Sequence, residues 1–178
     1  MTQINTWLQF ALQQMAAESY LDRVLSGELQ LEQALRLGNN RLSAALASEP
    51  ILLGKTRMTD QQIIGFSVHY DIIDHHANDA TGFSATLIKD LRDPTGKTYT
   101  LSFRSLEYQN QAQGGDWERD GQGGAAGEIA GAGFALGQLV SMERYYEELK
   151  RSGKLPAGST LNVTGYSLGG HLATVFTM

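Results

Sequence analysis

The segment that most constrains the fold of this chain lies near residue 167. Thr160–Thr164 is a short run rich in β-branched residues, and Gly165-Tyr166-Ser167-Leu168-Gly169-Gly170 follows it before an apolar run that favours a helix. A serine between glycines at the junction of a strand and a helix predicts a sharp turn that exposes the hydroxyl group. Gly165 and Gly169 leave room for that turn, and Gly170 lets the helix pack close to the strand.

A serine hydroxyl becomes a nucleophile when it is held exposed, beside a base, and facing hydrogen-bond donors for an oxyanion. The predicted turn exposes Ser167, and the backbone amide of Leu168 is the first donor that we expect. The pattern is that of a nucleophile elbow, so we predict that Ser167 is catalytic. The alternative is a glycine-rich turn with an incidental serine.

The composition of the chain argues against some classes of function and of binding partner. The net charge of -5, without a basic stripe interleaved with aromatics, argues against nucleic-acid binding. The chain has no cysteine, so its stability comes from packing rather than disulfides, which leaves the redox compartment open. No signal peptide and no transmembrane anchor are expected, and the localisation stays open between the cytoplasm and secretion without a cleaved signal.

Residues 1–50 are predicted to be a helical N-terminal extension or cap that covers the core. One apolar stripe consists of Ile4, Leu8, Ala11 and Met15, and a second of Leu31, Leu35, Leu42 and Leu46. Ser26 with Glu28 marks the expected start of the second helix, and the helical region ends at Glu49-Pro50. Thr59–Gln62 can form a capping box, yet residues 64–72 alternate as a strand would, so that segment stays open.

The remaining residues, 57–178, predict an α/β domain. A hairpin is expected from Phe83–Lys89 and Thr98–Arg104, with a turn at Asp93–Gly96. A single helix is expected over Glu128–Arg151, and its predicted apolar stripe is Leu136, Leu139, Met142, Tyr146 and Leu149. The order hairpin, helix, strand, turn, helix is typical of an α/β sheet enzyme.

Over residues 80 to 178 the chain resembles the class 3 (fungal-type) lipases of the α/β-hydrolase fold. Four segments carry the resemblance, and they are Gly82–Thr86, Tyr99–Arg104, Asp116–Asp120 and Gly165–Gly170. The resemblance implies a partial α/β-hydrolase sheet with a nucleophile elbow, preceded by the N-terminal helical segment. It also implies a serine ester hydrolase, a lipase or esterase, whose substrate is a lipid ester.

The resemblance further implies the oxyanion hole and the pocket. In the family the strand matching Thr98–Arg104 ends in F-R-G-T or F-R-G-S, and the residue after the glycine gives the second oxyanion donor. Here Ser105 stands in the place of the glycine and Leu106 in that of the donor. The candidate pocket residues are Tyr166, where the family often has histidine, together with His171, Asp116 and Trp117.

A complete Ser, acid and His triad in the usual chain order is not expected from these residues. Only residues 168–178 follow the nucleophile, and they contain no carboxylate. His171 lies one helical turn after Ser167 and is interpreted as a structural or pocket-edge residue. We expect the acid and base to come from the remainder of the same chain or from a complementing chain, so that these residues are the front part of a longer hydrolase.

The sequence patterns for other functional sites are weaker than the pattern around Ser167. Histidines 69, 75 and 76 lie upstream of Ser167, and one of them could in principle serve as the base, because geometry rather than chain order defines a triad. The segment from Asp71 to Asp79 contains metal-ligand residue types, but it is interpreted as a solvated loop. No metal and no cofactor are predicted. Two alternative functions are compatible with the same nucleophile elbow. One is an acyltransferase, and the other is a binding module without a working base.

Overall fold

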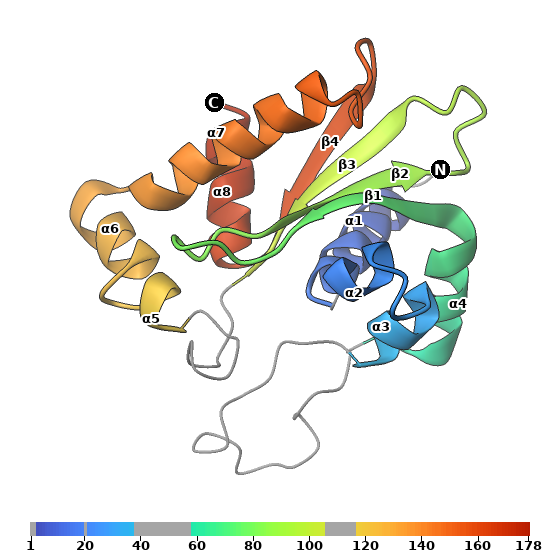
Figure 1. Cartoon of the computed structure of the whole chain (residues 1–178), viewed down its shortest axis with the longest axis horizontal. Helices are drawn as coiled ribbons and strands as arrows, with labels where there is room; N and C mark the ends of the chain where they lie inside the picture. The colour runs from blue at the N-terminus through green and yellow to red at the C-terminus, as the bar shows by residue number, and fades with distance from the viewer. Residues whose placement is uncertain (1–2, 20, 38–57, 106–116) are drawn as a thin grey trace.

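The computed structural model describes residues 3–19, 21–37, 58–105 and 117–178 as a mixed α/β structure around one sheet (Figure 1). The strands are β1 (Tyr70–His76), β2 (Ala85–Asp90), β3 (Thr98–Phe103) and β4 (Thr160–Gly165). The helices are α1 (Gln3–Ala17), α2 (Leu21–Leu25), α3 (Leu31–Leu37), α4 (Asp60–His69), α5 (Trp117–Asp120), α6 (Ala125–Ala132), α7 (Leu136–Arg151) and α8 (Leu168–Phe176). The predicted α/β class is confirmed at this level.

The four strands lie in chain order, β1-β2-β3-β4. The β1–β2 and β2–β3 pairs are antiparallel and the β3–β4 pair is parallel, so β1, β3 and β4 run in one direction. Their carboxyl ends therefore meet at one edge of the sheet. In register across this edge, His76 pairs with Ala85, Ala85 with Phe103, and Phe103 with Gly165.

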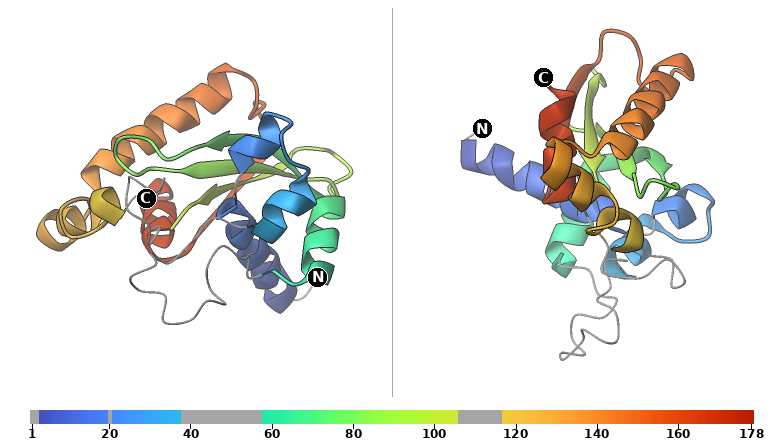
Figure 2. Two further views of the ribbon diagram at one scale, coloured as in Figure 1. Left: turned by 60° about the horizontal axis from the view of Figure 1, so that its bottom comes forward. Right: turned by 90° about the vertical axis from the view of Figure 1, so that its left-hand side faces the viewer.

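Helices cover both faces of the sheet, as the two views in Figure 2 show. On one face, α6, α7 and α8 enclose a core whose buried members include Phe83, Leu87, Leu101, Phe103, Leu149 and Leu172. On the other face, α1 to α4 pack over a second core that includes Ala16, Leu21, Leu35, Ile63, Phe66, Ile72 and Ile88. The N-terminal helices thus share a core with the sheet, because they bury one of its two apolar faces.

The buried face of α1 differs from the predicted one. Ile4 and Leu8 are exposed, whereas Gln13, Ala16 and Ala17 are buried. Contacts of α1 with β3 and β4 explain the difference, because a helix meets the sheet closely through small side chains. The apolar stripe of α1 therefore covers the core only along its C-terminal half, where Leu12 and Met15 pack against it.

The predicted start of the second helix is also wrong. Ser26 follows α2 rather than opening a helix, and Gly27, with φ 78°, turns the chain before α3 begins at Leu31. Leu35 is buried on α3 as expected. Leu42, Leu46 and the Glu49-Pro50 boundary lie outside the described residues.

The segment from residue 59 to residue 72, for which the sequence allowed a helix or a strand, contains a helix followed by a strand. The Thr59 hydroxyl accepts the N–H of Gln62, and the Gln62 side chain accepts the N–H of Thr59, which completes a capping box at the start of α4. Such a cap stabilises a helix by about 1 kcal/mol. The helix ends at His69, and the chain continues directly into β1.

The predicted hairpin is confirmed as β2 and β3. Its turn is held by Asp93, whose carboxylate accepts the N–H of Thr95 at 2.9 Å and that of Lys97 at 3.0 Å. Gly96 has φ 64°, a value that glycine adopts without steric cost. Local turn chemistry therefore fixes the register of the two strands.

The single helix expected over Glu128–Arg151 is two helices. Gly133 has φ 82° and ends α6, and α7 begins at Leu136. A left-handed glycine cannot continue an α-helix, and its N–H caps the Ile129 carbonyl instead. The break also rotates the buried face, so that Leu136 is exposed and Tyr145 is buried.

Strand β4 pairs only with β3 among the described residues. Parallel strands are usually buried within a sheet, with a neighbour on each side. The residues of β4 from Leu161 onward are accordingly half-buried rather than buried. The second edge of β4 carries no proline, no charged residue and no recorded bulge, which are the features that usually protect an edge strand.

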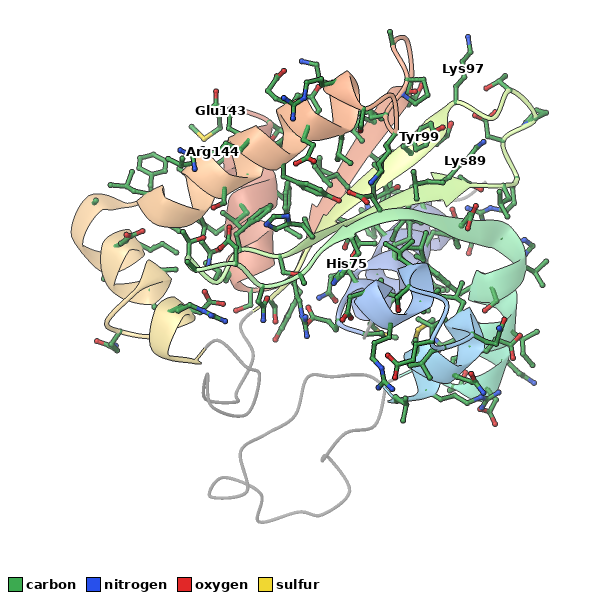
Figure 3. The ribbon with its side chains drawn as sticks, viewed as in Figure 1. His75, Lys89, Lys97, Tyr99, Glu143 and Arg144 are labelled. Atoms are coloured by element: carbon green, nitrogen blue, oxygen red, sulfur yellow. The ribbon has the colours of Figure 1, made fainter. Side chains whose placement is uncertain are left out.

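His75 lies on the sheet face that α1 and α2 cover, and its burial there can be tested through the pH dependence of stability. It is labelled in Figure 3 on β1, and its Nδ1 lies 2.8 Å from the hydroxyl of the buried Thr86. Burial lowers the pKa of His75 to about 3, and the positive charge of Arg104 adds to the effect. The unfolded chain, with a pKa of 6.5, therefore binds more protons than the folded chain between pH 6.5 and 3.

Stability is expected to fall as pH drops through this window. Between pH 7 and pH 5 the free energy of unfolding should decrease by about 1–2 kcal/mol through His75 alone. Urea unfolding at both pH values measures this loss, and His75→Gln, which can still bond Thr86, should reduce it. His69→Gln, which replaces another histidine at an exposed position, is the matched control. An equal loss in His75→Gln would contradict the assignment.

Candidate active site

The turn between β4 and α8 has the geometry expected for an exposed nucleophile. Ser167 has φ 54° and ψ −120°, and it is the only non-glycine residue with positive φ among those that the structure describes. These angles are those of the first central position of a type II′ turn, which glycine normally occupies. Ser167 is exposed, as is Tyr166 before it.

The glycines around Ser167 are required by close backbone contacts. A Cβ atom on Gly165 would lie 2.1 Å from the carbonyl oxygen of Gly169, and one on Gly169 would lie 2.4 Å from that of Phe103. Real Cβ atoms essentially never approach so closely, so neither position accepts a side chain without a backbone shift. Gly170 is less constrained, since its Cβ would lie 3.4 Å from the Gly165 oxygen.

The start of α8 lies beside Ser167. The Ser167 carbonyl accepts the N–H of His171 at 3.1 Å, which closes the first turn of the helix. The first N–H groups of an α-helix have no partner within the helix, and that of Leu168 is among them. The Leu168 side chain is buried in the core under α7 and α8, which fixes the position of this first turn.

The exit of β3 packs directly against this turn. A Cβ on Gly169 would lie 2.8 Å from the Arg104 carbonyl oxygen, so the residues after Phe103 lie against the first turn of α8. Arg104 and Ser105 are both buried, and the N–H of Arg104 donates to the Ser84 carbonyl at 3.0 Å. The predicted second donor, Leu106, lies outside the described residues.

One contact at the end of β3 could not be predicted from the sequence. The N–H of Ser105 donates to the carboxylate of Glu18, which follows α1. The two residues are 87 positions apart, and no local pattern joins them. Only the packing of α1 on the sheet brings them together.

The remaining pocket candidates are only partly placed. Asp116 lies outside the described residues, and Trp117 opens α5 with a side chain that is not described. His171 is on α8 with its ring centroid 6.2 Å from that of Phe134, and its Nε2 atom has no hydrogen-bond partner. His171 is half-buried and makes no hydrogen bond with the Ser167 hydroxyl, and its assignment to a pocket edge stays a prediction.

The upstream histidines are distant from Ser167. His75 and His76 end β1 at the carboxyl edge of the sheet, but β1 is three strands from β4. At a spacing of about 4.8 Å between strands, their backbones lie roughly 14 Å from Gly165, beyond the reach of a hydrogen bond. His76 packs instead against Phe83 and Tyr145, with its Nε2 3.6 Å from Asp79. His69 lies at the opposite end of β1.

The described residues contain no group of three or more His, Cys, Asp or Glu side chains that could hold a metal ion. The segment around Asp79 is tied internally, since that carboxylate accepts the N–H and the hydroxyl of Thr81. As for membrane spans, no helix in the described part of the chain combines the length and the apolar character that crossing requires.

Comparisons with known proteins give no further assignment. No protein-family model matches this chain, and neither a curated protein nor a solved structure matches it significantly.

Proposed function

We propose that this chain carries the nucleophile of a serine ester hydrolase, and that the β4–α8 turn is a nucleophile elbow in part of an α/β-hydrolase sheet. One observation carries the proposal, the exposed Ser167 at φ 54° and ψ −120° between glycines that admit no Cβ. Strain of this kind costs about 1–3 kcal/mol and persists only where the surrounding structure enforces it. A strained, exposed serine at the carboxyl edge of a sheet is the arrangement that acyl transfer needs.

In the proposed mechanism, the Ser167 hydroxyl oxygen attacks the ester carbonyl carbon while a base takes its proton. The resulting oxyanion is held by the N–H of Leu168 and by that of Leu106. Collapse of the tetrahedral species forms the Ser167 acyl ester and releases the alcohol, which receives the proton. Water then hydrolyses the acyl ester by the same steps. The resemblance described above favours a lipid ester as substrate.

The base is the part of the proposal that these residues do not supply. The chain has four histidines, and the three on α4 and β1 lie far from Ser167 while His171 makes no bond to its hydroxyl. We propose that a histidine and a carboxylate reach Ser167 from a further segment or a complementing chain. The edge of β4 with which no described strand pairs leads to Ser167, and we propose that an added strand there would bring them.

The same observation favours a second candidate, a binding module that keeps the elbow without catalysis. In that case Ser167 would show no special reactivity, because no base raises its nucleophilicity. The two candidates differ in whether a serine-directed reagent forms a bond with the Ser167 oxygen.

Labelling with a fluorophosphonate tests the proposal. The reagent forms a bond between phosphorus and the oxygen of an activated serine, with loss of fluoride. With the longest natural polypeptide that contains these residues, we expect one adduct, located by mass spectrometry on Ser167 and lost in Ser167→Ala. Ser152→Ala, at an exposed serine directly after the end of α7, should label normally. The absence of any Ser167-dependent labelling would end the enzyme proposal in favour of the binding module.

A further inference from the structure

Helices α1 and α4 lie on the same face of the sheet (Figure 2), and a cavity of about 400 Å³ lies between them. Tyr70, which begins β1, and Arg92, which follows β2, also line the cavity. Ser167 follows the carboxyl end of β4, and β1 and β4 run in one direction. The cavity is therefore at the opposite edge of the sheet from Ser167, and its volume is within the range of small-molecule sites.

The guanidinium group of Arg92 is held in the cavity wall by three elements of the fold. Its Nε and Nη2 atoms donate to the two carboxylate oxygens of Asp90 at 2.9 and 2.6 Å. Nη2 also lies 3.1 Å from the side-chain oxygen of Gln9 and 2.5 Å from the hydroxyl of Tyr70. The guanidinium carbon lies 4.7 Å from the centre of the Tyr70 ring.

Two donors of Arg92 remain for a ligand. A guanidinium group has five N–H groups, and the two on Nη1 have no recorded partner among the described residues. Because the group is already fixed in place, little side-chain entropy is lost when Nη1 binds an oxygen atom. Arg92 is thus a preorganised donor in the wall of the cavity.

Gly65 is a second and independent observation at the same place. It lies within α4 and lines the cavity, and a Cβ atom there would meet nothing within 4 Å beyond its chain neighbours and the helix backbone. Its φ is not positive. Neither close packing nor backbone conformation therefore requires glycine, although glycine destabilises a helix relative to alanine. The missing side chain leaves the cavity open on the α4 side.

The other walls combine apolar contact with neutral hydrogen-bonding groups. Leu12 and Phe66 line the cavity, and the rings of Phe66 and Tyr70 are in contact, with centroids 4.9 Å apart. The side-chain amide of Gln61 has no recorded partner in the described part of the chain. No carboxylate is among the described residues that line the cavity, and its one guanidinium is paired with Asp90. Such walls complement an apolar tail and an uncharged polar head.

We propose that this cavity binds a small neutral amide with an aliphatic tail. The oxygen of the amide accepts N–H groups of Arg92 Nη1, and its N–H donates to the side-chain oxygen of Gln61. The tail lies on Leu12 and Phe66, beside Gly65. A carboxylate head would be repelled by Asp90, and an ammonium head by the guanidinium. The site shares no residue with the β4–α8 turn, so it is independent of the proposed ester hydrolysis.

Titration with hexanamide, hexanoate and hexylammonium tests the site, because these probes have similar tails and differ in the charge of the head. Binding is followed in NMR spectra of the isotope-labelled protein. We expect hexanamide to shift the backbone amide signals of α1 and α4 and the Nε–H signal of Arg92, with a Kd on the order of 1 mM for a ligand of this size. The two charged probes should bind at least about fivefold more weakly.

Gly65→Leu is the decisive variant, because its side chain would fill the cavity from α4. Hexanamide binding should weaken by at least about tenfold. Urea unfolding should show no loss of stability, since leucine favours a helix over glycine. If Gly65→Leu is less stable than the parent, Gly65→Ala replaces it, with an expected weakening of about twofold to threefold. Gly131→Leu is the matched control, because its Cβ on α6 would also meet nothing within 4 Å and it does not line the cavity.

Three results would overturn the proposal. They are no hexanamide-dependent shifts at the cavity up to the solubility limit, equal affinity of the parent and the Gly65 variant, and tighter binding of hexanoate than of hexanamide. The last would assign the cavity to a carboxylate instead. Fluorophosphonate labelling of Ser167 is a separate measurement at the other edge of the sheet, so its failure leaves the amide site intact, and failure of the titration leaves the proposed function intact.

Discussion

Alanine in place of Gly165 is expected to lower the free energy of unfolding by about 3 kcal/mol and to abolish labelling of Ser167. The added Cβ would lie 2.1 Å from the oxygen and 2.3 Å from the carbon of the Gly169 carbonyl. Both atoms belong to the backbone of α8, so no side-chain rotation relieves the clash. The helix must shift away from β4, and the shift destroys the turn at Ser167.

Gly169→Ala should have a similar effect from the other side. Its Cβ would meet the carbonyl oxygens of Phe103 at 2.4 Å and Arg104 at 2.8 Å, which separates α8 from the exit of β3. Urea unfolding followed by circular dichroism gives the stabilities, and fluorophosphonate labelling gives the state of the turn.

Gly170→Ala is the matched control for both glycine variants. It lies next to Gly169 in the same helix, its Cβ would stand 3.4 Å from the nearest atom, and alanine favours a helix by about 1 kcal/mol over glycine. It should therefore stay within about 1 kcal/mol of the parent and keep its labelling. Equal stability of Gly165→Ala and Gly170→Ala would contradict the close approach of β4 and α8.

The elements that the sequence predicted correctly carry local signals. The β2–β3 hairpin follows from alternating residues on both sides of an Asp-Pro-Thr-Gly turn, and the β4–α8 junction follows from its glycines. In both cases residues close in sequence fix the backbone. The positive φ of Ser167 belongs to this class in part, since the glycines on both sides of it are the sequence signal for the turn, while the exit of β3 packs against it.

The features that the sequence did not predict depend on tertiary packing. Periodicity on α1 suggested that Ile4 and Leu8 were buried, but the helix meets the sheet through Ala16 and Ala17 at its other end. A stripe predicts a buried face only where a partner surface lies along the whole helix. The contact of Glu18 with Ser105 is of the same kind, because it exists only once α1 lies on the sheet.

The sequence contains a local signal for the break between α6 and α7, namely glycine, but the surrounding helical pattern favoured a single helix. Gly131 and Gly133 lie within the run that was predicted as one helix, and only Gly133 ends a helix. Glycine within a helical pattern is tolerated at a cost of about 1 kcal/mol, so composition alone did not separate a tolerated glycine from a cap.

Replacing Ser167 with glycine is expected to make the protein more stable and inactive. Ester hydrolysis should fall by more than about 1,000-fold, as for loss of a serine nucleophile in other hydrolases. The free energy of unfolding should rise by about 1 kcal/mol, because glycine adopts φ 54° without strain and this gain exceeds its cost in chain entropy. Hydrolysis of a short-chain ester and urea unfolding provide the two measurements.

Ser167→Ala separates the two effects. Alanine also lacks the hydroxyl group but keeps the Cβ atom, so it should lose the same activity while its stability stays within about 0.5 kcal/mol of the parent. A glycine variant less stable than the alanine variant would show that the backbone at Ser167 is unstrained, against the basis of the proposal. Retained hydrolysis in either variant would show that another group is the nucleophile. A binding module that keeps this turn would give the same order of stabilities with no hydrolysis in the parent, so the pair of measurements distinguishes strain that serves catalysis from strain that does not.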